Sequence, residues 1–255
     1  MRRREKFILS SILLSLGLLA TQYISLDYRL LAVGVFFFIT YAVSAWALFE
    51  DIEGIEWMTT VPFPALYAVS VSLFYFLLPS NILSRIAILL LFGVGMYGLY
   101  LTSNIYSVAK MRTIQLLRAA HAVGLFFVLL IMFFFANTLF SFHYPFWVNG
   151  VGSALACFPL AIITLWSIEL KKKIERSLWL DAGMVSVLVG FLSMVVSFFP
   201  ASIWVNSVYV VGALYTCLGI LITKLEGKLF KNTVYEYMSM WVIMSIAFFF
   251  LLPWK

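Results

Sequence analysis

The side chains that could do chemistry in this sequence are few, and the only clustered carboxylates occur in the stretch "FEDIEGIEW". It holds Glu50, Asp51, Glu53 and Glu56. Grouped carboxylates could act as general acid and base, hold a divalent cation or contact a basic partner. The simpler interpretation is a solvated turn between two helices. We keep contact with a partner or a cation as the hypothesis for these four residues and assign none of them a catalytic role.

Two further patterns suggest chemistry that their surroundings do not support. The stretch "GVGMYG", with Gly93, Gly95 and Gly98, matches the dinucleotide fingerprint in letters only. That fingerprint requires a strand before it and a helix after it, whereas this one lies inside a long apolar segment, where close helix packing is the better interpretation. His121 and His143 lie at opposite ends of one predicted helix, roughly 30 Å apart, so they cannot share a metal ion. We therefore predict no metal, no cofactor and no enzyme.

The composition places the chain among membrane proteins. Hydrophobic residues make up 64% of the 255 positions and charged residues only 11%, far from the balance of a soluble domain. Cys157 and Cys217 lie in apolar segments and are predicted to be packing residues. The net charge of +6 does not indicate nucleic-acid binding, because the basic residues occur in short clusters between apolar runs.

These apolar runs predict an all-α bundle of about nine transmembrane helices, since about 20 residues cross the hydrocarbon of a bilayer. The first is an uncleaved N-terminal helix rather than a signal peptide, because it is too long and no cleavage motif follows it. The predicted spans are 7–26, 30–49, 61–79, 82–103, 119–141, 146–169, 178–199, 202–223 and 234–252.

The charged loops predict which way the helices cross. With a cytoplasmic N-terminus, all but three of the 17 Lys and Arg residues fall on the cytoplasmic side, and the exceptions are Arg29, Arg85 and Lys255. This bias is the positive-inside rule, so we predict a bacterial inner-membrane protein with its N-terminus inside and its C-terminus outside. Tryptophans near the helix ends, such as Trp46, Trp166 and Trp204, are consistent with interfacial belts.

The cytoplasmic basic residues are also the predicted contacts with membrane lipids. Juxtamembrane Lys and Arg side chains attract anionic headgroups. The candidates are Lys110, Arg112, Arg118, Lys171, Lys172, Lys173, Lys224, Lys228 and Lys231.

Similar residues recur 115 to 122 positions apart along the chain. They predict one domain built as a first helix (1–28) followed by two parallel four-helix halves (29–145 and 146–255). The stretch "SLFYFLLP" recurs as "VVSFFP" and "AFFFLLP", each time where a predicted helix leaves the membrane. Convergence of aromatic-rich helix ends is the alternative. The matched pairs are Trp46 with Trp166, Trp57 with Trp179, Pro79 with Pro200, Gly95 with Gly212 and Phe135 with Phe250.

Two stretches, "IEWMTTVPFPALYAVSVSLFYFLLP" and "RTIQLLRAAHAVGLFF", resemble an uncharacterised family of bacterial multi-pass membrane proteins. The resemblance covers most of the chain and implies no activity. We expect a non-enzymatic accessory or scaffold component that contacts lipids, another membrane protein or a second copy of itself. The alternative is a translocator of a lipid or a hydrophobic small molecule, which would suit the aromatic, weakly polar helices.

Overall fold

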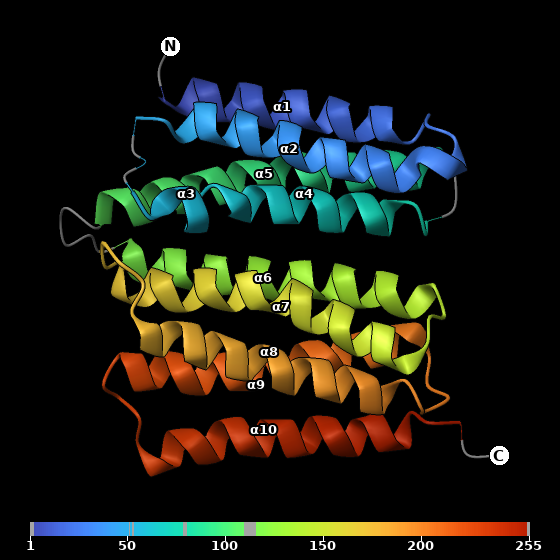
Figure 1. Cartoon of the computed structure of the whole chain (residues 1–255), viewed down its shortest axis with the longest axis vertical. Coiled ribbons are helices and arrows are strands. Elements are labelled where there is room, and N and C mark those ends of the chain that lie inside the picture. The colour runs from blue at the N-terminus through green and yellow to red at the C-terminus, as the bar shows by residue number, and fades with distance from the viewer. Residues whose placement is uncertain (1–2, 51, 53, 79–80, 110–115, 254–255) are drawn as a thin grey trace. The chain divides into compact units, whose positions relative to one another are not determined.

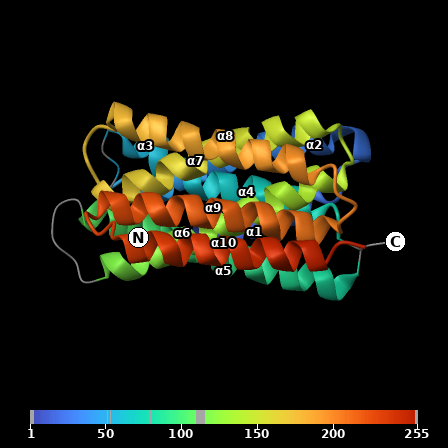
Figure 2. The same cartoon turned by 90° about the horizontal axis from the view of Figure 1, so that it is seen from below.

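The computed structural model describes residues 3–50, 52, 54–78, 81–109 and 116–253, and these residues form helices and turns without any strand. Long apolar runs form helices because a helix satisfies every backbone polar group within its own segment. In both views the helices within each part of the chain run side by side (Figure 1, Figure 2). The elements are α1 (Arg3–Thr21), η1 (Leu26–Tyr28), α2 (Arg29–Leu48), α3 (Glu56–Thr59), α4 (Pro62–Tyr75), α5 (Ile82–Ala109), α6 (Leu117–Ser141), α7 (Phe146–Glu169), α8 (Arg176–Val196), α9 (Ile203–Leu225) and α10 (Lys231–Phe250).

Eight of these helical segments are long and apolar enough to cross a membrane, counting α3 and α4 together as Glu56–Tyr75. The predicted all-α fold is therefore confirmed for the described residues. The first predicted span, 7–26, is wrong at its end, because α1 stops at Thr21. The backbone N–H groups of Gln22, Tyr23 and Ile24 bond to carbonyls three residues back, which tightens the last turn and ends the helix.

Prolines explain the interruption between α3 and α4. The predicted helix 61–79 begins at Pro62, whose missing N–H is tolerated in the first turn, and it ends at Tyr75 rather than at 79. Pro79, expected to stop this helix, lies outside the described residues. Pro159 lies inside α7 without dividing it, and α7 has the predicted bounds 146–169.

Contacts divide the chain into two compact units, residues 1–127 and 128–255, with the boundary inside α6. In the first unit α1 packs on α2 and α5, α2 packs on α4, and α4 packs on α5. In the second unit α7 packs on α8 and α9, α8 packs on α9, and α10 packs on α9. The predicted halves, 29–145 and 146–255, follow the supposed duplication and stay a prediction.

The "GVGMYG" stretch of α5 is a packing motif, as its apolar surroundings predict. A methyl group added at Gly93 would lie 2.9 Å from the hydroxyl oxygen of Ser15 on α1. One added at Gly95 would overlap the phenol of Tyr67 on α4, and one at Gly98 would lie 3.5 Å from the ring of Phe127 on α6. Gly93 and Gly95 thus allow α5 to approach α1 and α4 closely, whereas the distance at Gly98 is that of an ordinary contact.

The closest helix pair of the second unit is α7 with α8. We call their contact the α7–α8 seam, and it is made by Asn149, Gly150, Ser153, Gly190, Ser193 and Ser197. The hydroxyls of Ser153 and Ser193 lie 2.8 Å apart, and the amide of Asn149 donates to the Ser197 hydroxyl at 3.1 Å. A methyl group at Gly190 would lie 2.8 Å from both the Ala154 Cβ and the Gly150 carbonyl oxygen. Small residues therefore let the two backbones approach, and hydroxyls bond across the contact.

Candidate functional site

The N-terminus of α1 and the end of α2 meet through Glu50. Arg3 Nε donates to one carboxylate oxygen at 3.3 Å, and Lys6 Nζ donates to the other at 2.5 Å. The Lys6 ammonium also lies 5.9 Å from the centre of the Trp46 ring. The hydrogen bond and charge of Lys6, followed by the contact with Arg3, hold the pKa of Glu50 below its ordinary value. Glu50 therefore contacts the chain's own basic segment, and its contact with a cation or partner stays a prediction.

Glu56 does not behave as the solvated turn residue of the simpler interpretation. It is the first residue of α3 and only 1% exposed. Its carbonyl oxygen accepts the backbone N–H groups of Thr60 at 2.9 Å and Val61 at 3.1 Å, so the residue is part of a folded turn. Asp51 and Glu53 lie outside the described residues. Within the described part of the chain no three His, Cys, Asp or Glu side chains are grouped as a metal site would need.

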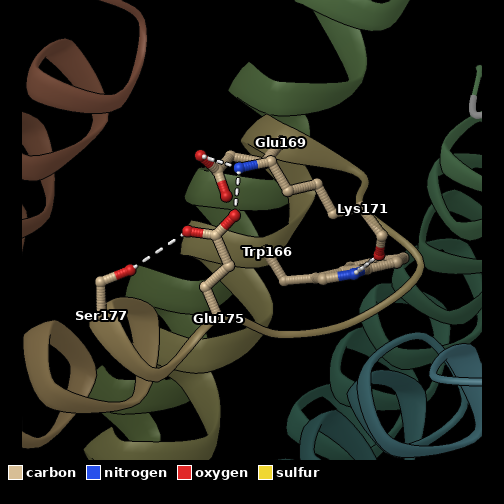
Figure 3. A network of polar contacts seen from close by, with 5 residues as sticks. All are labelled: Trp166, Glu169, Lys171, Glu175 and Ser177. Atoms are coloured by element: carbon tan, nitrogen blue, oxygen red, sulfur yellow. Dashed lines mark hydrogen bonds and ion pairs between the residues drawn. The ribbon is translucent and has the colours of Figure 1, made fainter.

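The turn between α7 and α8 carries a local polar network around Lys171 (Figure 3). Leu170 ends α7 in the left-handed conformation, with φ 49° and ψ 31°. This lets the Trp166 indole donate to the Lys171 carbonyl at 3.0 Å. Lys171 Nζ donates to Glu175 at 2.7 Å and to Glu169 at 3.1 Å. The Glu175 carboxylate, more than Glu169, raises the pKa of Lys171, and Lys171 lowers the pKa of Glu175.

Two further predicted lipid contacts are ion-paired. Lys224 pairs with Asp181 of α8 at 3.3 Å, and Lys228 pairs with Glu226 at 2.9 Å. Exposed pairs of this kind contribute little to stability, but they reduce the charge offered to a headgroup.

Four other predicted lipid contacts are not neutralised by an ion pair with a described residue. They are exposed and form no ion pair with any described residue: Arg118, Lys172, Lys173 and Lys231. Lys110 and Arg112 fall outside the described residues. The structure thus divides the predicted basic set into paired and free members, which sequence spacing alone does not do.

Trp46, Trp147 and Trp204 fit the interfacial prediction, whereas Trp166 does not. Trp46, Trp147 and Trp204 are about half exposed near helix ends, as headgroup contacts require. Trp166 is only 1% exposed, and its indole N–H bonds inside the α7–α8 turn. The pairing of Trp46 with Trp166 therefore joins residues with different environments.

Three buried asparagines of the second unit are incompletely hydrogen-bonded. Asn137, Asn149 and Asn206 are each between 3% and 6% exposed. One polar atom of each lacks a hydrogen-bond partner: Asn137 Nδ2, Asn149 Oδ1 and Asn206 Oδ1. All three lie within five residues of a helix end, so they mark the boundary of the apolar region rather than its middle.

Two outer grooves flank α1. The α1–α5 groove, lined by Ile8, Ile12, Leu16, Leu90 and Val94 among others, has a volume of about 530 Å³. The α1–α2 groove, of about 490 Å³, runs from Ile39 to Thr21, Ile24 and Tyr28. Both are almost wholly apolar in lining, which suits hydrocarbon chains rather than polar solutes.

Comparisons with protein families, with curated proteins and with solved structures gave no match to this chain.

Proposed function

We propose that this protein is a multi-pass protein of a bacterial inner membrane that acts as a non-enzymatic accessory or scaffold component. The observation that carries the proposal is the α7–α8 seam, where Ser153 bonds Ser193 and Asn149 bonds Ser197. These buried polar groups are used to hold helices together, and the described grooves open along apolar outer faces. Such a protein offers its charged ends and its apolar sides to other molecules. The resemblance to an uncharacterised membrane family is in keeping with this role and adds no activity.

The proposed orientation is N-terminus inside and C-terminus outside, with α1 as a ninth crossing. Within the first unit, the Arg3–Glu50 pair and the stacking of Phe7 on Tyr100 at 5.7 Å gather the N-terminus and the later part of α5 at one end. Within the second unit, the Lys224–Asp181 pair gathers the loops after α7 and α9 in the same way. Each unit, taken by itself, therefore has a group of described basic residues at one end, in line with the positive-inside rule.

The internal duplication is part of the same proposal. It would make α2, α4, α5 and α6 equivalent to α7, α8, α9 and α10. Within each set the first helix packs on the second and third, and the second packs on the third. This shared contact order of the first three helices supports a common ancestor for the two halves, and superposing the two four-helix halves in helix order tests it.

The alternative function is translocation of a lipid or hydrophobic small molecule. The specific observation that favours it is the pair of apolar grooves beside α1, of about 530 and 490 Å³, each large enough for a drug-sized apolar cargo.

Purification of the tagged full-length chain from native membranes tests the scaffold proposal. We expect a membrane-protein partner to co-purify in a fixed ratio, and the double variant K172Q/K173Q to weaken its recovery because two free, exposed charges are removed. K228Q is the matched control, since Lys228 is already paired with Glu226. A chain that purifies alone and moves fluorescent phospholipid between leaflets of proteoliposomes would refute the scaffold role and support the translocator.

A further inference from the structure

Several buried polar atoms without a hydrogen-bond partner lie at one end of the first unit. At this end α1 and α4 end and α2 and α5 begin. Four buried atoms there lack any hydrogen bond: Gln22 Nε2, Arg29 Nε, Tyr75 Oη and Arg85 Nε. We propose that this end of the unit binds a phosphate group, carried by a phospholipid headgroup or free in solution. The inference goes beyond the scaffold role and does not depend on it.

Arg29, Tyr75 and Arg85 are gathered at the end of α4. The Arg29 guanidinium lies 4.9 Å from the centre of the Phe76 ring, directly after α4. Tyr75 precedes Phe76 in the chain and interacts electrostatically with both Arg85 and Tyr23. Gln22 precedes Tyr23 in the turn after α1. Residues from the ends of four helices are thus brought to one place.

The chemistry of this group favours an anion. A guanidinium donates hydrogen bonds and cannot accept them, and it stays charged at every physiological pH. Arg29 and Arg85 form no ion pair with any described residue, and both are partly buried. A buried donor without an acceptor is costly, and a charged one more so. An oxyanion with several acceptor oxygens would satisfy both arginines, with the phenol and the amide as further donors.

Capping of helix ends is the competing explanation for these arginines. Cations are stabilised near helix C-termini, and α1 and α4 both end here. Capping would require the guanidiniums to donate to the terminal carbonyls, but Arg29 Nε and Arg85 Nε have no acceptor, and neither arginine side chain forms a hydrogen bond with a described residue. The long helices α2 and α5 also begin at this end, and their N-termini favour an anion.

The position of the two arginines is itself unusual. With Lys255 they are the only basic residues that the positive-inside pattern leaves on the non-cytoplasmic side. The α1–α2 groove reaches the same end at Thr21, Ile24 and Tyr28. A phospholipid could therefore place its phosphate on Arg29 and Arg85 and one acyl chain along α1.

The test uses the full-length protein in detergent and in phosphatidylcholine nanodiscs. In detergent, inorganic phosphate is titrated against chloride at equal ionic strength, and the thermal unfolding midpoint is followed. In nanodiscs with a minor fraction of phosphatidylglycerol, retained lipid is counted by native mass spectrometry. R29Q and R85Q are compared with R118Q, an exposed arginine at the opposite end of the same unit, and R29K and R85K keep the charge if the glutamine variants do not fold.

We expect R29Q and R85Q each to weaken binding of the phosphate group about tenfold to hundredfold, because one charge-assisted contact is lost, while R118Q matches the wild type. Retention of phosphatidylglycerol without a response to inorganic phosphate identifies a lipid site, and the reverse identifies a soluble anion. A wild-type protein that responds to neither, or an equal loss in R118Q, overturns the proposal. A scaffold partner in native membranes would be unaffected by these outcomes.

Discussion

Gly190 of α8 offers the sharpest test of the packing argument, because a second glycine of the same helix serves as its control. An added methyl group at Gly190 would lie 2.8 Å from the Ala154 Cβ and from the Gly150 carbonyl oxygen, which is backbone and cannot turn aside. At Gly183, seven residues earlier, the nearest atom is a ring carbon of Phe158 at 4.0 Å, an ordinary contact. G190A and G183A therefore make the same chemical change in a crowded and in an open position.

The comparison isolates the steric cost. Glycine to alanine in a helix gains about 1 kcal/mol of helix propensity at both positions, so that gain cancels in the difference. Overpacking costs about 1–3 kcal/mol. G190A should therefore have a free energy of unfolding about 1–3 kcal/mol lower than G183A, which is about 5- to 150-fold in the unfolding equilibrium constant.

Reversible unfolding in mixed micelles, followed by the loss of helical circular dichroism, measures the difference. G183A should be at least as stable as the wild type, and G190A less stable than G183A. If the two variants unfold at the same denaturant fraction, α7 and α8 do not approach as closely as Gly150 and Gly190 indicate, and the seam loses its role as the carrier of the scaffold proposal.

Three further predictions concern the seam, the acidic contact and the orientation. A double-mutant cycle of S153A and S193A should give a coupling energy of about 0.6 kcal/mol and no more than about 1.7 kcal/mol, whereas additive effects would contradict the hydroxyl contact. The pKa of Glu50 is lowered in the folded protein, so its ion pair stabilises the fold fully above pH 4.5 and is lost as the pH falls through the folded-state pKa. The difference in thermal unfolding midpoint between wild type and E50Q should therefore shrink below pH 4.5. A difference that stays constant with pH would argue against the ion pair. In a background without native cysteines, a cysteine at Lys173 should react with an impermeant maleimide only from the cytoplasmic side and one at His143 only from the other, and labelling of both from one side would refute the orientation.

Helix positions could be predicted where chemistry changes sharply along the chain. The bounds of α7, 146–169, agree because Pro145 precedes the helix and the "KKK" run follows it. The end of α1 could not be predicted in this way, since no proline, glycine or charged residue stands among residues 21–25 to mark it. The far end of α5 extends to Ala109, because a helix can continue beyond the apolar region once its backbone bonds are formed.

The candidate site was less predictable, because burial and pairing join residues that are distant in sequence. The carboxylate spacing identified Glu50 and Glu56 together, yet Glu50 pairs with Arg3 and Lys6 some 44 to 47 residues away, and Glu56 is buried at the start of α3. Only tertiary packing separates these environments. By contrast, the packing role of Gly95 followed from its place in an apolar segment, where small residues let neighbouring helices approach closely.

Arg29 and Arg85 are exceptions to the positive-inside rule, and their guanidinium groups are also partly buried without an ion-pair partner among the described residues. As exceptions to the positive-inside rule alone, they could be tolerated charges, since topology is decided by the majority of basic residues. If the only observation were that they are partly buried donors without acceptors, bound water could satisfy them. Surplus charge would be expected to extend into solvent, as Arg118 does, instead of lying over the Phe76 ring at 4.9 Å. Two guanidiniums held at one end of a helical unit and left unpaired by every described residue are an arrangement that an anion would complete.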